Sequence, residues 1–181
     1  MINHQKKGKK FMGYVHVYTG DGKGKTTAAL GLILRALGAG FRVILIQFLK
    51  KGDFSEIKAL RSFGDQIKIF QFGSGRFVKG MSGDKDKVLV FSGMKEAARA
   101  VKENLFDLVV LDEANCAMKL GLIEIGDIIS LIKRLPKGME LVLTGRDAPY
   151  EIIEAADLVT EMRMVKHYFQ KGTKAREGIE M

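Results

Sequence analysis

The sequence lacks several features that would assign it to common classes of protein. Its 181 residues contain one cysteine, Cys116, which excludes an intrachain disulfide framework. No uninterrupted apolar run approaches the roughly 18 residues of a membrane-spanning helix. The start of the chain, MINHQKKGKKFMG, is polar and basic and has no apolar leader segment. We therefore expect a cytoplasmic protein that has no membrane partner.

Two common kinds of catalytic centre are also missing. No group of Cys and His residues has the spacing of a zinc site, and nothing suggests a Ser-His-Asp triad. Aromatic residues are 8% of the chain and offer no obvious stacking platform for single-stranded nucleic acid. His16 lies within an apolar run and is interpreted as a packing residue, as is Cys116, whereas His167 has no assigned role.

The chain does have an excess of positive charge. Its formal net charge is +9 and its pI about 9.6. Such an excess suits polyanionic partners, which include nucleic acid, nucleoside triphosphates and anionic membranes. Part of it comes from Lys6, Lys7, Lys9 and Lys10. We interpret residues 1–12 as a solvated basic arm.

Apolar runs rich in strand-forming residues alternate with segments of helical periodicity. The expected strands are residues 14–19, 42–48, 68–72, 107–113, 140–145 and 157–165, and the expected helices are 26–37, 54–63, 85–105, 123–135 and 150–156. Several of the strands are almost continuously apolar, which is typical of strands buried on both faces. The alternation predicts an α/β fold with a mainly parallel sheet covered by helices on both faces.

The stretch TGDGKGKTT, residues 19–27, lies between the first expected strand and the first expected helix. It ends as a phosphate loop does, in Gly-Lys-Thr, and this strand-loop-helix context supports the assignment. The glycines let backbone N–H groups turn toward an anion at the positive end of a helix. The expected ATP-binding residues are Gly20, Asp21, Gly22, Lys23, Gly24, Lys25, Thr26 and Thr27. Thr19 stands where the motif has its first glycine, which is tolerable because Gly20 follows.

An acidic pair and an arginine follow two other expected strands. DLVVLDE ends in Asp112 and Glu113, and LTGR ends in Arg146. Acidic residues at the carboxyl end of a buried parallel strand lie near the nucleotide crevice and can reach Mg²⁺. Thr26, Asp112 and Glu113 are therefore the expected ligands of Mg²⁺ (or Mn²⁺), although a turn-capping role for the pair is the plain alternative. Arg146 is either a phosphate clamp or a surface residue.

No linker, repeat or low-complexity stretch divides the chain. We expect one phosphate-loop nucleotide-binding domain over residues 13–165, followed by a tail, 166–181, that packs near the site. The glycine-rich, charged stretch 73–86 is expected to be a long loop, and long loops in compact domains tend to be functional or disordered.

Five blocks together resemble a known family. They are GDGKGKTTAALG (20–31), VVLDE (109–113), LTGRDAP (143–149), ADLVTEM (156–162) and VKHYFQKGTKAREGIE (165–180). In this order and spacing they are similar to the phosphate-loop type of ATP:corrinoid adenosyltransferase, and the resemblance spans nearly the whole chain. The loop alone is weakly specific, whereas the five blocks together are strongly specific.

The resemblance implies a RecA-like phosphate-loop fold, usually in a homodimer, and small-molecule substrates. It implies transfer of the 5′-deoxyadenosyl group of ATP to the Co(I) centre of a corrinoid, with release of tripolyphosphate. The bond that breaks would be C5′–O of the ribose. Lys25, Thr26, Glu113 and Arg146 are the expected catalytic residues. A reducing flavoprotein is an expected partner, and nucleic acid is not.

The chain departs from the family pattern in two places. Asp21 stands where the family usually has Asn, so an acceptor-only carboxylate replaces an amide that can donate. The family's corrinoid loop usually carries a Gly-Phe-Thr-Trp-like element, but this chain has no tryptophan. The corresponding stretch is residues 75–78, and Arg76 and Phe77 are the expected corrinoid contacts. Phe77 would displace the lower axial ligand of cobalt.

Other readings of the same residues remain open. A RecA-like ATPase acting on nucleic acid would use Glu113 to orient water for hydrolysis of the γ-phosphate. A small-molecule or nucleoside kinase would need an acceptor base and an arginine-rich lid, and neither is visible. A non-catalytic nucleotide-binding regulator is the third. The products distinguish them: tripolyphosphate, ADP with phosphate, ADP with a phosphorylated acceptor, or none.

Overall fold

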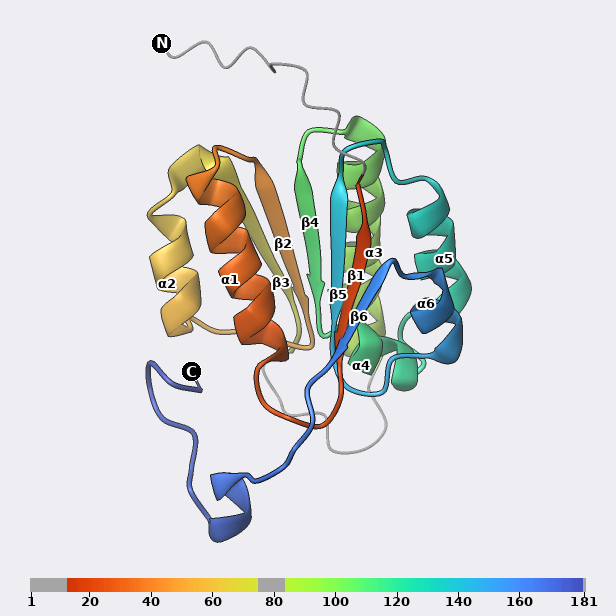
Figure 1. The fold of residues 1–181 in the computed structure, drawn as a ribbon. Coiled ribbons are helices and arrows are strands. Elements are labelled where there is room, and N and C mark those ends of the chain that lie inside the picture. The colour runs from red at the N-terminus through yellow and green to blue at the C-terminus, as the bar shows by residue number, and fades with distance from the viewer. Residues whose placement is uncertain (1–12, 75–83, 181) are drawn as a thin grey trace.

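The computed structural model describes residues 13–74 and 84–180 and shows a wholly parallel six-stranded sheet between two layers of helices (Figure 1). The strand order is β3-β2-β4-β5-β1-β6. The strands are β1 (Val15–Thr19), β2 (Val43–Phe48), β3 (Ile67–Phe72), β4 (Leu108–Asp112), β5 (Glu140–Thr144) and β6 (Leu158–Glu161). The helices are α1 (Lys25–Gly38), α2 (Ser55–Arg61), α3 (Asp84–Glu103), α4 (Ala114–Lys119), α5 (Ile125–Lys133) and α6 (Tyr150–Ala155), with 3-10 turns at Gly64–Gln66 and Tyr168–Lys171.

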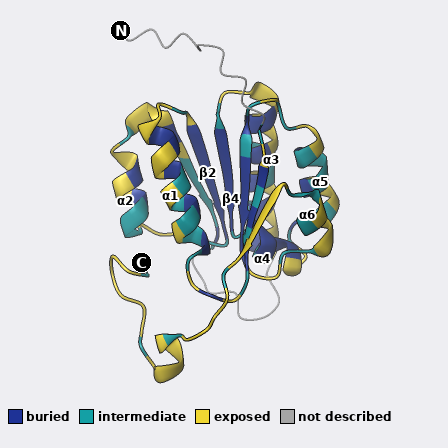
Figure 2. Cartoon of the chain, viewed as in Figure 1, coloured by how far each residue is buried: buried dark blue, intermediate teal, exposed yellow. Residues whose placement is uncertain are grey.

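The inner strands are buried because their sequences are apolar on both faces. Every residue of β2 and β4 is buried, as are the last four of β5 (Figure 2). Two apolar clusters flank the sheet. Ile33 of α1 and Ile57 of α2 belong to the one, and Ala97 of α3 and Ile128 of α5 to the other. The predicted α/β fold of the phosphate-loop class, with helices on both faces of the sheet, is confirmed.

Most element boundaries lie within two residues of those expected, and two differences bear on the site. The last strand ends at Glu161 rather than at residue 165, because its partner β1 ends at Thr19, where the chain turns into the glycine-rich loop. The backbone N–H of Met162 still donates to the carbonyl of Thr19 (2.8 Å), and beyond it no ladder continues. In addition, residues 84–86 of the expected loop are helical, since α3 begins at Asp84. Residues 75–83 of that loop lie outside the described residues.

The parallel sheet brings its functional positions to one edge. The carboxyl ends of β1, β2, β4 and β5 all face the lower side in Figure 1, where the loop after β1 and the C-terminal segment also run. In α/β sheets this edge is where ligands bind. Within residues 13–74 and 84–180, no helix is both long enough and apolar enough to cross a membrane.

Candidate nucleotide-binding site

The loop between β1 and α1 requires glycine at several positions. Gly20 and Gly24 have φ angles of +93° and +125°, which L side chains rarely adopt. Gly22 donates its backbone N–H to the carbonyl of Met162 (2.6 Å), and a Cβ on Gly22 would lie 2.7 Å from that oxygen. The loop therefore packs directly on the chain that follows β6, and its shape depends on the absence of side chains.

Thr19 has a structural role of its own in place of the motif's first glycine. It is buried as the last residue of β1, and its hydroxyl accepts a hydrogen bond from the backbone N–H of Ala148 (3.2 Å). The hydroxyl thus ties the start of the phosphate loop to the segment after β5. The missing glycine does not disturb the loop, because the positive φ angle falls on Gly20.

Lys25 begins α1 and points back into the loop. Its Nζ donates to the carbonyls of Gly20 (2.6 Å) and Gly22 (2.7 Å), and the residue is buried. Burial and the positive charge of Arg146 lower the pKa of the Lys25 ammonium from its ordinary value. Its contacts are with carbonyl dipoles rather than with a carboxylate, so an incoming phosphate would give it a full counter-charge.

Asp112, at the end of β4, is a fully buried carboxylate with four hydrogen-bond donors. Its Oδ1 accepts from the hydroxyls of Thr26 (2.9 Å) and Thr144 (2.7 Å), and its Oδ2 accepts from Gln47 Nε2 (3.0 Å) and Lys50 Nζ (2.7 Å). Burial alone would raise the pKa of the Asp112 carboxyl. The charge of Lys50 and these hydrogen bonds outweigh it, so the pKa lies below its usual value.

Glu113 follows in a left-handed backbone conformation, with φ +62°. Its backbone N–H donates to Thr144 Oγ1 (3.0 Å), which fixes the turn from β4 into α4. A non-glycine residue in this region of φ is uncommon and marks positions held by their surroundings. The turn leaves the Glu113 side chain partly exposed and lining the cavity described below.

Lys50 belongs to this cluster and was missed from the sequence. It follows β2, and its Nζ lies 2.7 Å from Asp112 Oδ2, 3.1 Å from Thr26 Oγ1 and 3.7 Å from Glu113 Oε1. Burial lowers the pKa of the Lys50 ammonium, but the charges of Asp112 and Glu113 outweigh burial and raise the pKa above its ordinary value. The ammonium therefore stays charged. A sequence signal did exist, because Lys50 lies two residues after the expected strand 42–48, at the same edge of the sheet as Asp112.

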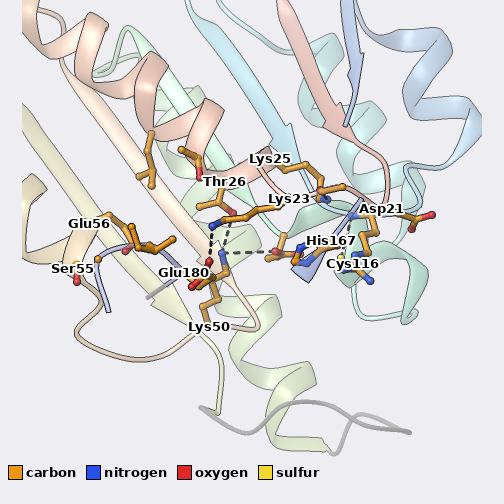
Figure 3. Close-up of a pocket in the computed structure, with 18 residues that line it drawn as sticks. Asp21, Lys23, Lys25, Thr26, Lys50, Ser55, Glu56, Cys116, His167 and Glu180 are labelled. Atoms are coloured by element: carbon orange, nitrogen blue, oxygen red, sulfur yellow. Dashed lines mark hydrogen bonds and ion pairs between the residues drawn. The ribbon is translucent and has the colours of Figure 1, made fainter. Parts of the chain in front are cut away.

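A cavity of about 560 Å³ opens over these residues (Figure 3). Its lining comprises residues 21–27 of the phosphate loop and helix α1 together with Leu30, Lys50, Ser55, Glu56, Glu113, Cys116, Arg146, His167, Gly178, Ile179 and Glu180. Burial and the negative charge of Glu113 raise the pKa of the Cys116 thiol to about 12, so the thiol stays neutral. The exposed Asp21 lies at the opposite end of the labelled group from Ser55 and Glu56 in Figure 3.

The C-terminal tail contacts the phosphate loop through Lys23. Lys23 Nζ donates to Glu180 Oε1 (2.8 Å) and to the hydroxyl of Tyr168 (3.0 Å), and that hydroxyl also donates to Glu180. Arg176 donates to both oxygens of the same carboxylate. Hydrogen bonds from Arg176, Lys23 and Tyr168 hold the pKa of Glu180 well below its usual range. Glu180 and Tyr168 are further site residues that were not named from the sequence.

Most of the expected site residues do come together. Residues 21–27, Glu113 and Arg146 line the cavity, whereas Gly20 and Asp112 are not among its lining residues. Asp112 is fully buried and reaches the site through its bonds to Thr26 and Lys50. Arg76 and Phe77, the expected corrinoid contacts, lie outside the described residues.

The donor set around Thr26 fits a hard divalent cation. The Thr26 hydroxyl lies 2.9 Å from Asp112 Oδ1, and Glu113 Oε1 lies 3.7 Å from the Lys50 ammonium that contacts both residues. Mg²⁺ prefers such oxygen ligands. Among residues 13–74 and 84–180, no group of three or more His, Cys, Asp or Glu side chains could hold a metal by itself. A metal at this site would therefore complete its shell with phosphate oxygens and water, as Mg²⁺ does in nucleotide sites.

Comparison with known proteins gives a consistent result. The family model described as "ATP:corrinoid adenosyltransferase BtuR/CobO/CobP" matches residues 11–181. A corrinoid adenosyltransferase of Pseudomonas aeruginosa is 37% identical over 93% of this chain and 83% of its own length. One of Sinorhizobium sp is 33% identical over 93% and 80%, and corrinoid adenosyltransferase CobA of Salmonella typhimurium is 33% identical over 93% and 85%. The chain belongs to the ATP:corrinoid adenosyltransferase family.

Proposed function

We propose that this protein is an enzyme that transfers the 5′-deoxyadenosyl group of ATP to the Co(I) centre of a corrinoid and releases tripolyphosphate. One observation in a chain of this family carries the proposal. Lys25 and Thr26, at the N-terminus of α1, share a single cavity with the acidic turn after β4. A phosphate chain bound there would meet loop N–H groups, two lysines and an oxygen-rich metal site.

The reaction itself needs no protein base. The electron pair of Co(I) forms the bond to C5′ of the ribose while the C5′–O bond breaks, and its electrons leave on the tripolyphosphate. Co(I) has no proton to lose. The protein must therefore hold C5′ in line with cobalt and neutralise the charge that develops on the leaving group. This requirement matches a cavity lined by four cationic side chains, Lys23, Lys25, Lys50 and Arg146.

The roles of individual residues follow from their positions. The loop N–H groups of residues 23–26, at the start of α1, bind phosphate oxygens, as helix N-termini do. Lys25 exchanges its two carbonyl partners for phosphate, and Lys23 adds a second positive charge at the mouth of the cavity. Arg146 lines the same cavity, and its guanidinium suits a bidentate contact with phosphate.

We further propose that Mg²⁺, or Mn²⁺ in its place, accompanies the nucleotide. Thr26 would ligate it directly and Asp112 and Glu113 directly or through water. When bound, the metal supplies positive charge to the phosphate chain. What supports the proposal is the set of oxygens that converges on Thr26 and the buried, ionised state of Asp112.

The proposal includes three partners: the corrinoid, a reducing flavoprotein and a second copy of the chain. Arg76 and Phe77 would contact the corrinoid, and a reducing flavoprotein would supply Co(I). A homodimer is supported by apolar side chains left exposed on the edge strand and just after it, among them Leu158, Val159 and Val165. Pairing of two such surfaces would remove apolar area from water.

The test is an anaerobic assay with Mg-ATP and chemically reduced cob(I)alamin. The cobalt spectrum and the phosphate product are followed together. Adenosylcobalamin formed in a one-to-one ratio with tripolyphosphate is the expected result. Formation of ADP with an unchanged cobalt spectrum would instead favour an ATPase, and ATP binding without any product would favour a regulator.

A further inference from the structure

We propose that the ammonium of Lys50 occupies the position of the divalent metal in the nucleotide-free protein, so that the metal enters only together with the nucleotide. The inference rests on the proposed function, because it concerns the metal that would accompany ATP. Lys50 would not bind the metal, as the predicted ligands would. It would keep the metal away from those ligands until the nucleotide arrives.

The contacts of Lys50 Nζ are those expected of the metal. It lies 3.1 Å from Thr26 Oγ1, 2.7 Å from Asp112 Oδ2 and 3.7 Å from Glu113 Oε1. One ammonium thus reaches all three residues that were predicted as metal ligands from the sequence. Thr26 donates its own proton to Asp112 Oδ1 and accepts from Lys50, so a lone pair that a metal would use is already engaged.

The backbone around Lys50 is built to hold this position. Leu49, just before it, has φ +59°, a left-handed conformation that is uncommon for a leucine. Its N–H donates to the carbonyl of Phe72 (3.0 Å) at the end of β3. Gly73 packs so closely that a Cβ on it would lie 2.4 Å from the backbone nitrogen of Lys50. The neighbouring strand therefore fixes the bend that turns Lys50 toward Asp112.

A metal and this ammonium exclude one another from the same oxygens. Two cations within contact distance of one buried carboxylate repel strongly, because little water screens them. A metal without nucleotide could bind only those molecules in which Lys50 has left the oxygens. Because these molecules are a small fraction of the total, the apparent affinity for the metal is reduced by that fraction. A metal that carries a triphosphate brings anionic oxygens, and these give the displaced ammonium a new partner. The Lys50 side chain is 24% exposed and lines the cavity into which the displaced ammonium would turn.

Mn²⁺ binding, followed by electron paramagnetic resonance of the free ion, tests the inference without any turnover. Four proteins are titrated without nucleotide: wild type, Lys50→Met, Lys50→Arg and Lys51→Met. Methionine keeps the length of the side chain and removes its charge, arginine keeps a cation, and Lys51 is an exposed neighbour that serves as the matched control. We expect Lys50→Met to bind Mn²⁺ about tenfold more tightly or better, and the other three to bind weakly and alike.

Two results would overturn the inference: a folded Lys50→Met protein with wild-type Mn²⁺ affinity, or wild-type protein that already binds Mn²⁺ tightly without nucleotide. Removal of Lys50 leaves Asp112 without its counter-ion, so circular dichroism checks that each variant folds. If Lys50→Met does not fold, Lys50→Gln, which retains a donor for Asp112, is used with the same criteria.

A second titration, with ATP present, separates this inference from the proposed function. If the wild type binds Mn²⁺ in the presence of ATP, but Lys50→Met has the wild-type Mn²⁺ affinity without nucleotide, then Lys50 does not occupy the metal position. The proposed function is unaffected by that result. If the wild type binds ATP but no Mn²⁺, the metal assigned in the proposed function is refuted, and the inference about Lys50 is refuted with it.

Discussion

At the scale of single residues, the centre of the site is a carboxylate that no solvent reaches. Asp112 is stabilised in its ionised form by four donors from three different segments of the chain. A buried charge is tolerated only when it is paired and hydrogen-bonded in this way. Each donor is therefore expected to affect both stability and the geometry of the turn into α4.

Thr144→Val tests this expectation. The change preserves shape but removes one donor to Asp112 Oδ1 and the acceptor of the Glu113 N–H. We expect the free energy of unfolding to fall by about 1–3 kcal/mol, the cost of leaving buried polar groups unpaired. Urea denaturation measures it. Thr160→Val on the exposed strand β6 is the matched control and should change stability by less than about 0.5 kcal/mol.

Lys25→Ala tests the phosphate loop directly. The substitution removes the buried ammonium that would neutralise the leaving tripolyphosphate, so we expect kcat/KM for adenosyl transfer to fall by about 100-fold or more. Steady-state kinetics with cob(I)alamin measure the change. Lys51→Ala, on an exposed neighbour of the site, should retain wild-type kinetics. Near-wild-type turnover in Lys25→Ala would refute the role assigned to the loop.

At the scale of elements, the carboxylate of Glu180 is the charged partner through which the C-terminal tail contacts Lys23 of the phosphate loop. Because the pKa of Glu180 is depressed, the contact is fully present above the ordinary pKa of a glutamate, about 4.3, and is lost as the pH falls through the lower folded value. The backbone N–H of Arg176, which donates to Glu180 Oε2 (2.9 Å), reports on it. We expect its NMR shift to be constant from pH 8 to about pH 5 and to change only in stronger acid.

Glu180→Gln weakens the same contact at neutral pH. Trypsin should cleave the tail at Arg176 about two- to five-fold faster, since an exposed ion pair contributes little more than that. Glu154→Gln, at an exposed position on α6 outside the tail, is the control and should be cleaved at the wild-type rate. Equal cleavage of both variants would mean that the carboxylate of Glu180 does not hold the tail.

The sequence predicted the elements better than the contacts between them. Five helices and six strands were expected near their observed bounds, because apolar periodicity and the alternation of strand and helix are local signals. Helix α4 was not expected, since it spans only six residues. The phosphate loop and the acidic pair were found because each has a motif. Lys50 was missed although it follows an expected strand, because its contact with Asp112 depends on the left-handed bend at Leu49, for which there is no sequence motif.

At the scale of the whole molecule, the exposed edge of the sheet bears on assembly. Val159 is 41% exposed on β6 and Leu34 is 56% exposed on α1. If the proposed homodimer uses the edge strand, light scattering should give twice the 20.1 kDa chain mass for the wild type. Val159→Lys should shift the protein to monomer, whereas Leu34→Lys should not. A monomeric wild type would overturn the proposed dimer, and a dimeric Val159→Lys protein would place the contact elsewhere.

The strand order also determines when this protein can fold during its synthesis. Among the six strands of this sheet, β1 leaves the ribosome first, yet its two neighbours are β5 and β6, the last two of the six to be made. Strands β2, β3 and β4 can pair while translation continues, but Val15 must wait for Leu141, and Thr19 for Glu161. The loop that would bind the nucleotide follows the first of these strands but is assembled only with the last two, so a nascent chain cannot hold ATP until β5 and β6 have been made.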